Sequence, residues 1–236
     1  AQQIEDATGH DVNRTWFVDG WRPSNLQRKV DNQKDTARFV LGFRGQTDSG
    51  WDWDTGLVVS KASMDDVTAN RIGAHELYEG LNDTTSAAIN PFAATNNNIE
   101  RALVDVYRYD TSKLRSFDFK LSKPDLFSTK AGDVALLIGG EYRHEAYADD
   151  RDPLLDGSVL YTGSSGLTHP FVSSVIGSSP STDTIGERNV DSLFMEMQIP
   201  LMENMDAQFA LRGEHMGDID DSAVVGKFAI GYEPIE

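Results

Sequence analysis

The chain of 236 residues carries 38 acidic and 21 basic side chains, a formal charge of −17, and this excess of acid argues against a nucleic-acid partner because phosphate binding needs a basic surface. The absence of cysteine excludes a disulfide framework, a thiolate nucleophile and a cysteine metal site. No run of about 18 apolar residues occurs, which excludes a transmembrane helix, whereas transmembrane strands stay open because their alternation keeps the mean hydropathy low.

The N-terminal part of the chain contains segments in which apolar and polar residues alternate, as they do along a strand with one apolar face. Residues 14–22 hold three large aromatic residues and predict a first strand, and residues 24–35 predict an exposed connection. Residues 36–45 and 51–61 alternate clearly, and the turn-forming residues 46–50 join them. The sequence therefore predicts a hairpin after the first strand.

The middle of the chain combines a long stretch without strand period and two further strands. Residues 62–109 predict a long loop, within which residues 69–81 predict a short helix. Residues 114–122 restore the alternation, and a short connection through Lys123-Pro124-Asp125 and Lys130-Ala131-Gly132 leads to residues 133–147. That fifteen-residue segment is much longer than the usual strand of about five or six residues.

The last third repeats this arrangement. Residues 148–187 predict a second long loop, rich first in aspartate and then in serine, glycine and threonine. Strands are predicted at residues 189–201, 206–215 and 222–232, and residues 217–221 predict an acidic hairpin loop. Long connections thus follow strands of one direction and short ones follow strands of the other. This asymmetry indicates an all-β fold, an antiparallel transmembrane β-barrel segment of about eight strands with short periplasmic turns and long extracellular loops.

A soluble β-sandwich or barrel is the alternative, because its strands also alternate apolar and polar residues. In that case the chain would be a binding or adhesion module that uses its long loops. Three observations favour the membrane interpretation: charged residues on the polar faces of the strands, strands of ten or more residues, and loops segregated by length. A β-rich hydrolase is less well supported, since no nucleophile or acid pair stands in a known context, and we expect no enzymatic activity.

Five segments in order carry features of one family: residues 39–45 with 51–54, Asn90-Pro91-Phe92, Gly139-Gly140-Glu141-Tyr142-Arg143-His144-Glu145-Ala146-Tyr147, residues 195–201 with 209–214, and residues 225–234. They resemble the barrel of TonB-dependent outer-membrane receptors, in which a GxEYRxExY strand and an NPFG loop are common. Ala93 departs from the glycine of that loop.

The resemblance implies that residues 1–236 are an internal segment of such a barrel in a bacterial outer membrane. Receptors of this family have about twenty-two strands and a plug inside the barrel, and no plug-like segment or aromatic terminal strand is recognisable here. The partners then implied are outer-membrane lipid, the remaining strands, the plug and, through the plug, TonB. The implied function is the uptake of a scarce nutrient, which could be a siderophore, a vitamin, a carbohydrate or a peptide.

Candidate site residues fall into three groups. The charged residues on the polar faces would line the lumen of the barrel: Arg38, Arg44, Asp52, Asp54, Glu141, Arg143, Glu145, Arg212, Glu214 and Lys227. Aromatic residues of the loops are candidates for ligand contacts: Trp21, Tyr78, Tyr161 and Phe171. Asp149, Asp150, Asp152 and Asp156 form a dense acidic stretch that could bind calcium, although a solvated acidic loop is the favoured interpretation. No other cofactor is expected, and the five histidines show no zinc-ligand spacing.

Overall fold

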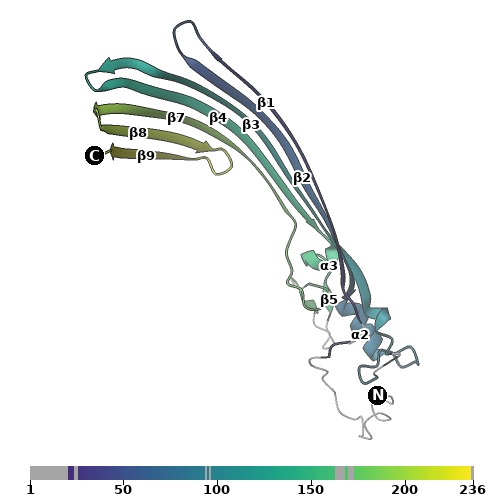
Figure 1. Cartoon of the computed structure of the whole chain (residues 1–236). Helices are drawn as coiled ribbons and strands as arrows, with labels where there is room; N and C mark the ends of the chain where they lie inside the picture. Colours follow the sequence, from purple (N-terminus) through teal and green to yellow (C-terminus); the bar gives the residue numbers. More distant parts are fainter. Residues whose placement is uncertain are drawn as a thin grey trace. The chain divides into compact units, whose positions relative to one another are not determined.

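The chain is organised around one long antiparallel sheet in a computed structural model that describes residues 21–23, 26–93, 95, 97–162, 168–169 and 173–234. Seven strands lie in the order β1-β2-β3-β4-β7-β8-β9 in the sheet (Figure 1). This is also their order along the chain, so each of the seven pairs with the one before it and the one after it. Their bounds are β1 Lys29–Gln46, β2 Asp52–Ile72, β3 Leu103–Thr129, β4 Gly132–Arg151, β7 Thr184–Met202, β8 Met205–Met216 and β9 Asp221–Tyr232. The sheet is open, with β1 and β9 at its edges.

Alternation in the sequence decides which residues share a face of this sheet, and the strand register confirms it. Residues paired across antiparallel strands point to the same face. Met195 pairs with Leu211 and Met197 with Phe209, which itself pairs with Phe228 on β9. The intervening rows carry the charged residues: Arg212 lies between Phe194 and Val225, and Ala210 lies between Glu196 and Lys227. One face of β7, β8 and β9 is therefore apolar and the other is polar.

The connections between strands also follow the predicted asymmetry. At one end of the strands they are short, at residues 47–51, 130–131 and 203–204. At the other end, residues 73–102 and 152–183 form long connections, whereas residues 217–220 form a short one. In the first short turn Gly50 adopts φ 78°, a left-handed conformation that glycine enters without strain.

The strands extend beyond the predicted bounds. β2 continues to Ile72 and β3 begins at Leu103, so the first long connection is shorter than the predicted 62–109. β3 also continues through Lys123-Pro124-Asp125, the first part of a predicted connection, and ends at Thr129. The turn lies at residues 130–131, within the second part of that predicted connection. In these extensions the apolar and polar residues no longer alternate regularly. The strands are held there by backbone hydrogen bonds, which do not depend on the side chains and therefore leave no pattern in the sequence. The predicted connection at 24–35 is likewise strand from Lys29 onward.

The helix predicted at 69–81 is displaced toward the C-terminus, because pairing of β2 occupies its first residues. The observed helix is α2, Ala74–Asn82. Of the strand predicted at 14–22, only residues 21 and 22 are described, and they belong to no strand. The second long connection, predicted at 148–187, is narrowed in the same way, since β4 ends at Arg151 and β7 begins at Thr184.

Two compact units make up the chain. Unit 1 contains Ala1–Lys34, Met64–Asp110 and Asp149–Thr184, and unit 2 contains Asp35–Ser63, Thr111–Ala148 and Ile185–Glu236. β1, β2, β3, β4 and, by Thr184 alone, β7 therefore contribute residues to both. Unit 1 also holds the minor elements: α2, the 3-10 helix η1 (Ile99–Ala102), α3 (Pro153–Asp156), β5 (Tyr161–Thr162) and β6 (Thr168–His169). No helix in the described part of the chain combines the length and apolar character of a membrane span.

The two long connections pack together in unit 1 instead of extending as separate loops. Its small core consists of Ile89, Ile99 and Ala102, against which Trp21, Ile72 and Leu77 pack. Backbone hydrogen bonds tie one connection to the other, with Ala74 N donating to Ser174 O at 2.7 Å and Ile176 N to Ile72 O at 2.8 Å. This interlocking was not predicted, because neither connection shows a periodic apolar pattern.

Candidate functional site: the two faces of unit 2 and the packed loops of unit 1

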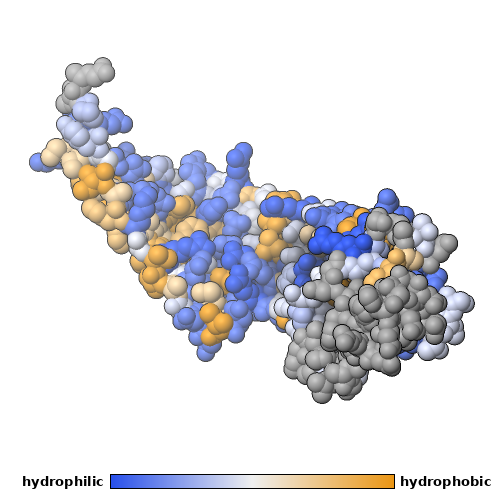
Figure 2. All heavy atoms as spheres, turned by 90° about the horizontal axis from the view of Figure 1, so that it is seen from below, coloured by the Kyte–Doolittle hydropathy of each residue, from blue (hydrophilic) through white to orange (hydrophobic). Residues whose placement is uncertain are grey.

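Unit 2 exposes the large apolar side chains of one sheet face. Phe39 and Phe43 of β1, Phe117 of β3, and Val224 and Phe228 of β9 are all more than half exposed. Figure 2 shows such apolar side chains, in orange, at the surface among polar ones in blue. A folded protein in water seldom leaves many large apolar side chains of one face uncovered.

Polar residues lie at one end of this apolar face on the four strands β4, β7, β8 and β9. The hydroxyl of Tyr142 donates to Asn189 Oδ1 at 3.0 Å, and His144 Nδ1 lies 2.8 Å from the same oxygen. On the neighbouring hairpin, His215 Nδ1 lies 3.2 Å from Ser222 Oγ. Hydrogen-bonding side chains therefore terminate the apolar rows at the end nearest the long connections.

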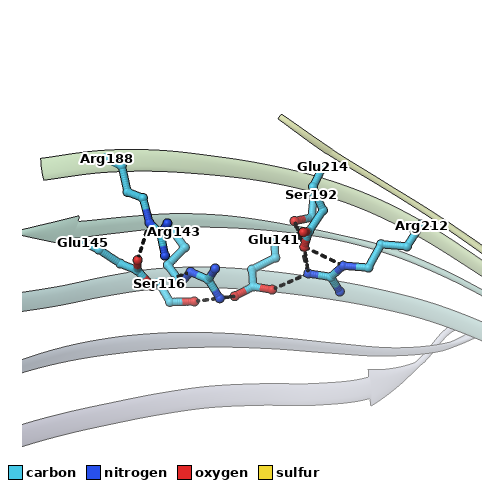
Figure 3. A network of polar contacts seen from close by, with 8 residues as sticks. All are labelled: Ser116, Glu141, Arg143, Glu145, Arg188, Ser192, Arg212 and Glu214. Atoms are coloured by element: carbon cyan, nitrogen blue, oxygen red, sulfur yellow. Dashed lines mark hydrogen bonds and ion pairs between the residues drawn. The ribbon is translucent and has the colours of Figure 1, made fainter. Parts of the chain in front are cut away.

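The opposite face of unit 2 carries a network of paired charges, which Figure 3 shows in close-up. Arg212 is at its centre: its Nη2 lies 3.2 Å from Glu141 Oε2 and 2.7 Å from Glu214 Oε1. Ser192 Oγ donates to Glu214 Oε1 at 3.1 Å. Four strands are thereby linked, since Ser116 on β3 also contacts Glu141 on β4 at 3.5 Å.

A second part of the same network lies along β4 and β7. Arg143 Nε lies 2.9 Å from Glu145 Oε1, and Arg188 Nε lies 2.6 Å from Glu145 Oε2. With Arg212, Glu141 and Glu214, the network contains three arginines and three glutamates, so its formal charge is zero. Each partly exposed pair contributes only about 0.2–1 kcal/mol, so the main effect is to fix the positions of the side chains.

A glycine makes room for the aromatic member of this face. The ring of Phe194 lies over β4 at Gly139, where an added Cβ would be 2.4 Å from Phe194 Cζ and 2.7 Å from Phe119 O. The guanidinium carbon of Arg212 lies 5.6 Å from the centre of the Phe194 ring, a distance suited to a cation–π contact. The absence of a side chain at position 139 thus allows Phe194 to support the central arginine.

Most of the charged residues predicted on the polar face lie on it. Glu141, Arg143, Glu145, Arg212 and Glu214 join the network described above. A separate open hollow is lined by four further side chains of this face, Arg44, Asp52, Asp54 and Lys120. Lys227 Nζ donates to Gln208 Oε1 at 3.0 Å, and Gln208 in turn donates to Glu196. Arg38 is exposed on the edge strand β1, outside the network.

Arg188 was missed in the sequence because it stands just before the alternating segment at 189–201. Its separation from Ser192 is four residues, which places both side chains on the same face of β7. This even separation could have identified Arg188 in the sequence as a residue of the polar face. The uncharged members Ser116 and Ser192 were also overlooked, because only charged side chains were considered for this face.

The acidic stretch in unit 1 does not form a common cage of carboxylates. Asp149 is buried, and its two oxygens accept hydrogen bonds from Arg108 Nε and Nη2, both at 3.0 Å. Arg151 Nη2 donates to Asp149 Oδ2 at 2.9 Å. Burial alone would raise the pKa of the Asp149 carboxyl, but the hydrogen bonds from Arg108 and Arg151 outweigh it and hold that pKa below its usual value.

The neighbouring aspartates serve the local backbone. Asp152 caps α3 by accepting a hydrogen bond from Leu154 N at 2.9 Å, and Asp156 accepts one from Ser158 N at 2.6 Å. Asp150 is exposed. Across the described residues, no group of three or more histidine, aspartate or glutamate side chains is arranged to hold a metal ion, and the predicted calcium site therefore finds no geometric counterpart there.

Of the four loop aromatics proposed as ligand contacts, the structure describes the side chains of two. Trp21 packs against the core of unit 1, and Tyr78 is half-buried on α2. Tyr161 belongs to β5, but its side chain lies outside the described residues, as does all of Phe171. A different aromatic pair was not singled out in the sequence: Tyr107 and Tyr109 of β3 stack with ring centres 4.6 Å apart.

Comparisons with known proteins bear on the fold. No protein family model matches the chain, and no curated protein matches it. Among solved structures, the chain is similar to one described as "Structure of the RagAB peptide transporter", with a TM-score of 0.53 and 15% identity. The match covers 86% of this chain and 20% of that one, so the chain spans about a fifth of the length of the protein it resembles. A long antiparallel sheet of this kind is thus part of a known transporter structure.

Proposed function

We propose that the chain forms part of the wall of a TonB-dependent transporter in a bacterial outer membrane, which takes up a scarce nutrient. In this proposal the strands of unit 2 cross the bilayer, with the apolar face in contact with lipid and the charged face toward the lumen. The packed loops of unit 1 lie on the extracellular side and take part in ligand recognition. No enzymatic step is involved.

The observation that carries the proposal is the exposed apolar face opposite a charge-balanced polar face. Transfer of a large apolar side chain from water into an apolar environment contributes about 1.5–3 kcal/mol, so a sheet with many such side chains gains strongly from lipid. The apolar rows also have a suitable length. They run from Leu193 to Leu201, from Met205 to Gly213 and from Val224 to Tyr232, close to the ~9–11 tilted residues that cross a bilayer.

The soluble β-sandwich requires a second sheet packed on the apolar face. Within the described ranges the chain contains the seven-stranded sheet and a two-stranded hairpin, and the hairpin belongs to unit 1. The apolar face of unit 2 therefore lacks the covering layer that a sandwich would provide. This supports the membrane proposal over the binding-module alternative.

Open edges make further strands part of the proposal. In lipid, unpaired backbone groups along β1 and β9 would cost several kcal/mol each. We therefore place additional strands beside both edges, and a plug inside the barrel that they complete. Energy would reach the transporter from TonB through that plug.

A peptide is the first ligand to test, because the similar solved structure is described as a peptide transporter. Cells that carry the complete protein would be supplied with labelled peptides, and uptake would be measured with TonB present and with TonB deleted. The proposal predicts uptake that requires both the complete protein and TonB. Uptake that is unchanged without TonB would contradict energised transport, and siderophores, vitamins and carbohydrates would be compared in the same assay.

A further inference from the structure

Three cationic residues lie at one end of the apolar side of unit 2, and the charge network of the opposite face does not include them. On β3, Lys113 and Arg115 are exposed in the same alternating rhythm as Phe117 and Phe119, whereas Ser116 belongs to the polar face. On β2, Lys61 is exposed in the same rhythm as Leu57 and Val59. Side chains two residues apart on a strand share a face, so the three cations continue the apolar rows.

The cations of the two strands are neighbours. Gly56 of β2 lies against Asp118 of β3, where an added Cβ would be 2.6 Å from Asp118 Oδ2. β2 and β3 are adjacent and antiparallel. Moving five residues forward from Gly56 reaches Lys61, and moving five residues backward from Asp118 reaches Lys113, so these two residues lie opposite each other across the two strands. Lys61 and Lys113 therefore lie side by side, with Arg115 beside Val59. The three form a basic row at the end of the apolar face nearest the long connection 73–102.

Carboxylates do not neutralise this basic row. In the described part of the chain, neither Lys61, Lys113 nor Arg115 has an acidic oxygen within ion-pair distance. The chain nevertheless has 38 acidic residues against 21 basic ones, and Arg143, Arg188 and Arg212 on the polar face are all paired. Three unpaired cations together in so acidic a chain suit an anion supplied from outside it.

The opposite end of the apolar face is different. There Lys123 Nζ lies 6.0 Å from the centre of the Trp51 ring and donates to Ser49 O at 2.6 Å. Lys123 Nζ also lies 3.8 Å from Asp125 Oδ1, so this cation has a carboxylate, an aromatic ring and a carbonyl oxygen as partners and needs no further anion. The unpaired basic charge is thus found at the end of the long connections.

We propose that Lys61, Lys113 and Arg115 bind the phosphate groups of lipid head groups in the leaflet that faces the long connections. Long basic side chains keep their stems on apolar surface while their charged ends reach the polar layer, and phosphate accepts hydrogen bonds from both guanidinium and ammonium groups. The inference rests on the proposed membrane location of the apolar face.

The test uses the complete protein in nanodiscs that contain either a phosphorylated diglucosamine lipid or the same lipid without its phosphates. The measured quantity is the amount of this lipid retained per protein after washing. Each cation near an anionic surface is worth about 1 kcal/mol, or about fivefold in affinity, so the triple variant Lys61→Gln, Lys113→Gln, Arg115→Gln should retain the phosphorylated lipid about a hundredfold more weakly at low salt. Retention of the dephosphorylated lipid should be unchanged.

The matched control removes three cations from the polar side of the sheet, in the variant Arg38→Gln, Arg44→Gln, Lys120→Gln, and should retain the lipid as the unmodified protein does. Equal retention by the two triple variants would overturn the inference, as would displacement of the lipid by millimolar inorganic phosphate. Insertion into both kinds of nanodisc with no preference for the phosphorylated lipid would also overturn it while leaving the proposed function intact. Failure to insert into either would instead contradict the proposed function.

Discussion

At the scale of single residues, Gly139 shows how the absence of a side chain positions a charged network. Phe194 occupies the space that a Cβ at position 139 would take, and Arg212 lies over the Phe194 ring. The arrangement of side chains on the polar face therefore depends on the glycine at position 139 as well as on the alternation of residues. A strand that lacked this glycine could keep its alternation and still lose the arrangement of the central arginine.

The substitution Gly139→Ala should destabilise the folded protein by about 1–3 kcal/mol, the usual cost of overpacking a filled site. The control is Gly213→Ala, since the nearest atom to an added Cβ there is Val224 Cγ2 at 4.0 Å, and it should change the free energy of unfolding by less than about 0.5 kcal/mol. Thermal unfolding of the complete protein in lipid would measure both. Equal effects at the two glycines would show that Phe194 does not depend on the space at position 139.

A second effect at the residue scale concerns acid pH. Hydrogen bonds from Thr85, followed by that from Arg101, lower the pKa of Asp83 from 3.8 to about 2. The pKa of Asp149 is also lowered. A carboxyl whose pKa is lower in the folded state adds stability above the unfolded pKa, and this stability is lost as the pH falls through the folded pKa. Unit 1 should therefore keep its stability at neutral pH and lose part of it between pH 3.8 and about 2.

Hydrogen exchange of the amides in residues 73–102 and 173–183 would follow this loss. Protection is expected to be constant from pH 7 to about pH 4 and to fall below it. The double variant Asp83→Asn, Asp149→Asn should be less protected at pH 7 and should show a flatter dependence on pH. A fall in protection already near pH 6 would indicate that other groups, and not these carboxyls, control the unit.

At the scale of elements, the faces of the strands were predictable and their ends were not. Alternation in residues 189–201 and 206–215 assigned the faces that the register of β7 and β8 confirms. The extension of β3 through Pro124 was missed because proline lacks an amide hydrogen and normally interrupts a strand. Packing of the long connections around Ile89 and Ile99 could not be predicted, since it depends on contacts distant in the sequence.

The element-scale prediction compares two neighbouring positions of β8. Phe209 belongs to the apolar rows, whereas Gln208 contacts Glu196 and Lys227 on the polar face. If the apolar face contacts lipid, Phe209→Arg should cost about 2–4 kcal/mol near the midplane of the bilayer, and Gln208→Arg should cost much less. Denaturant unfolding of the complete protein in lipid vesicles measures both free energies. Equal costs at the two positions would favour a core covered on both sides.

At the scale of the whole molecule, one set of strands supports two different environments. In unit 2 the apolar face lacks a covering layer among the described residues, while the polar face neutralises its own charges. In unit 1 the same long strands continue into connections that fold around a small core. The sequence indicated the first property through its alternation. The second property appears only in the structure.

The central claim is that the apolar face of unit 2 lies in lipid, and adjacent valines of β9 test it most directly. Val224 and Val225 are 73% and 61% exposed and lie on opposite faces, paired with Gly213 and Arg212 respectively. The chain has no cysteine, so Val224→Cys and Val225→Cys each provide a single site in it for a fluorescent label. In the complete protein, reconstituted with lipids brominated on their acyl chains, the label at position 224 should be strongly quenched and the label at 225 should not. Equal quenching at both positions, or stronger quenching at 225, would contradict the account.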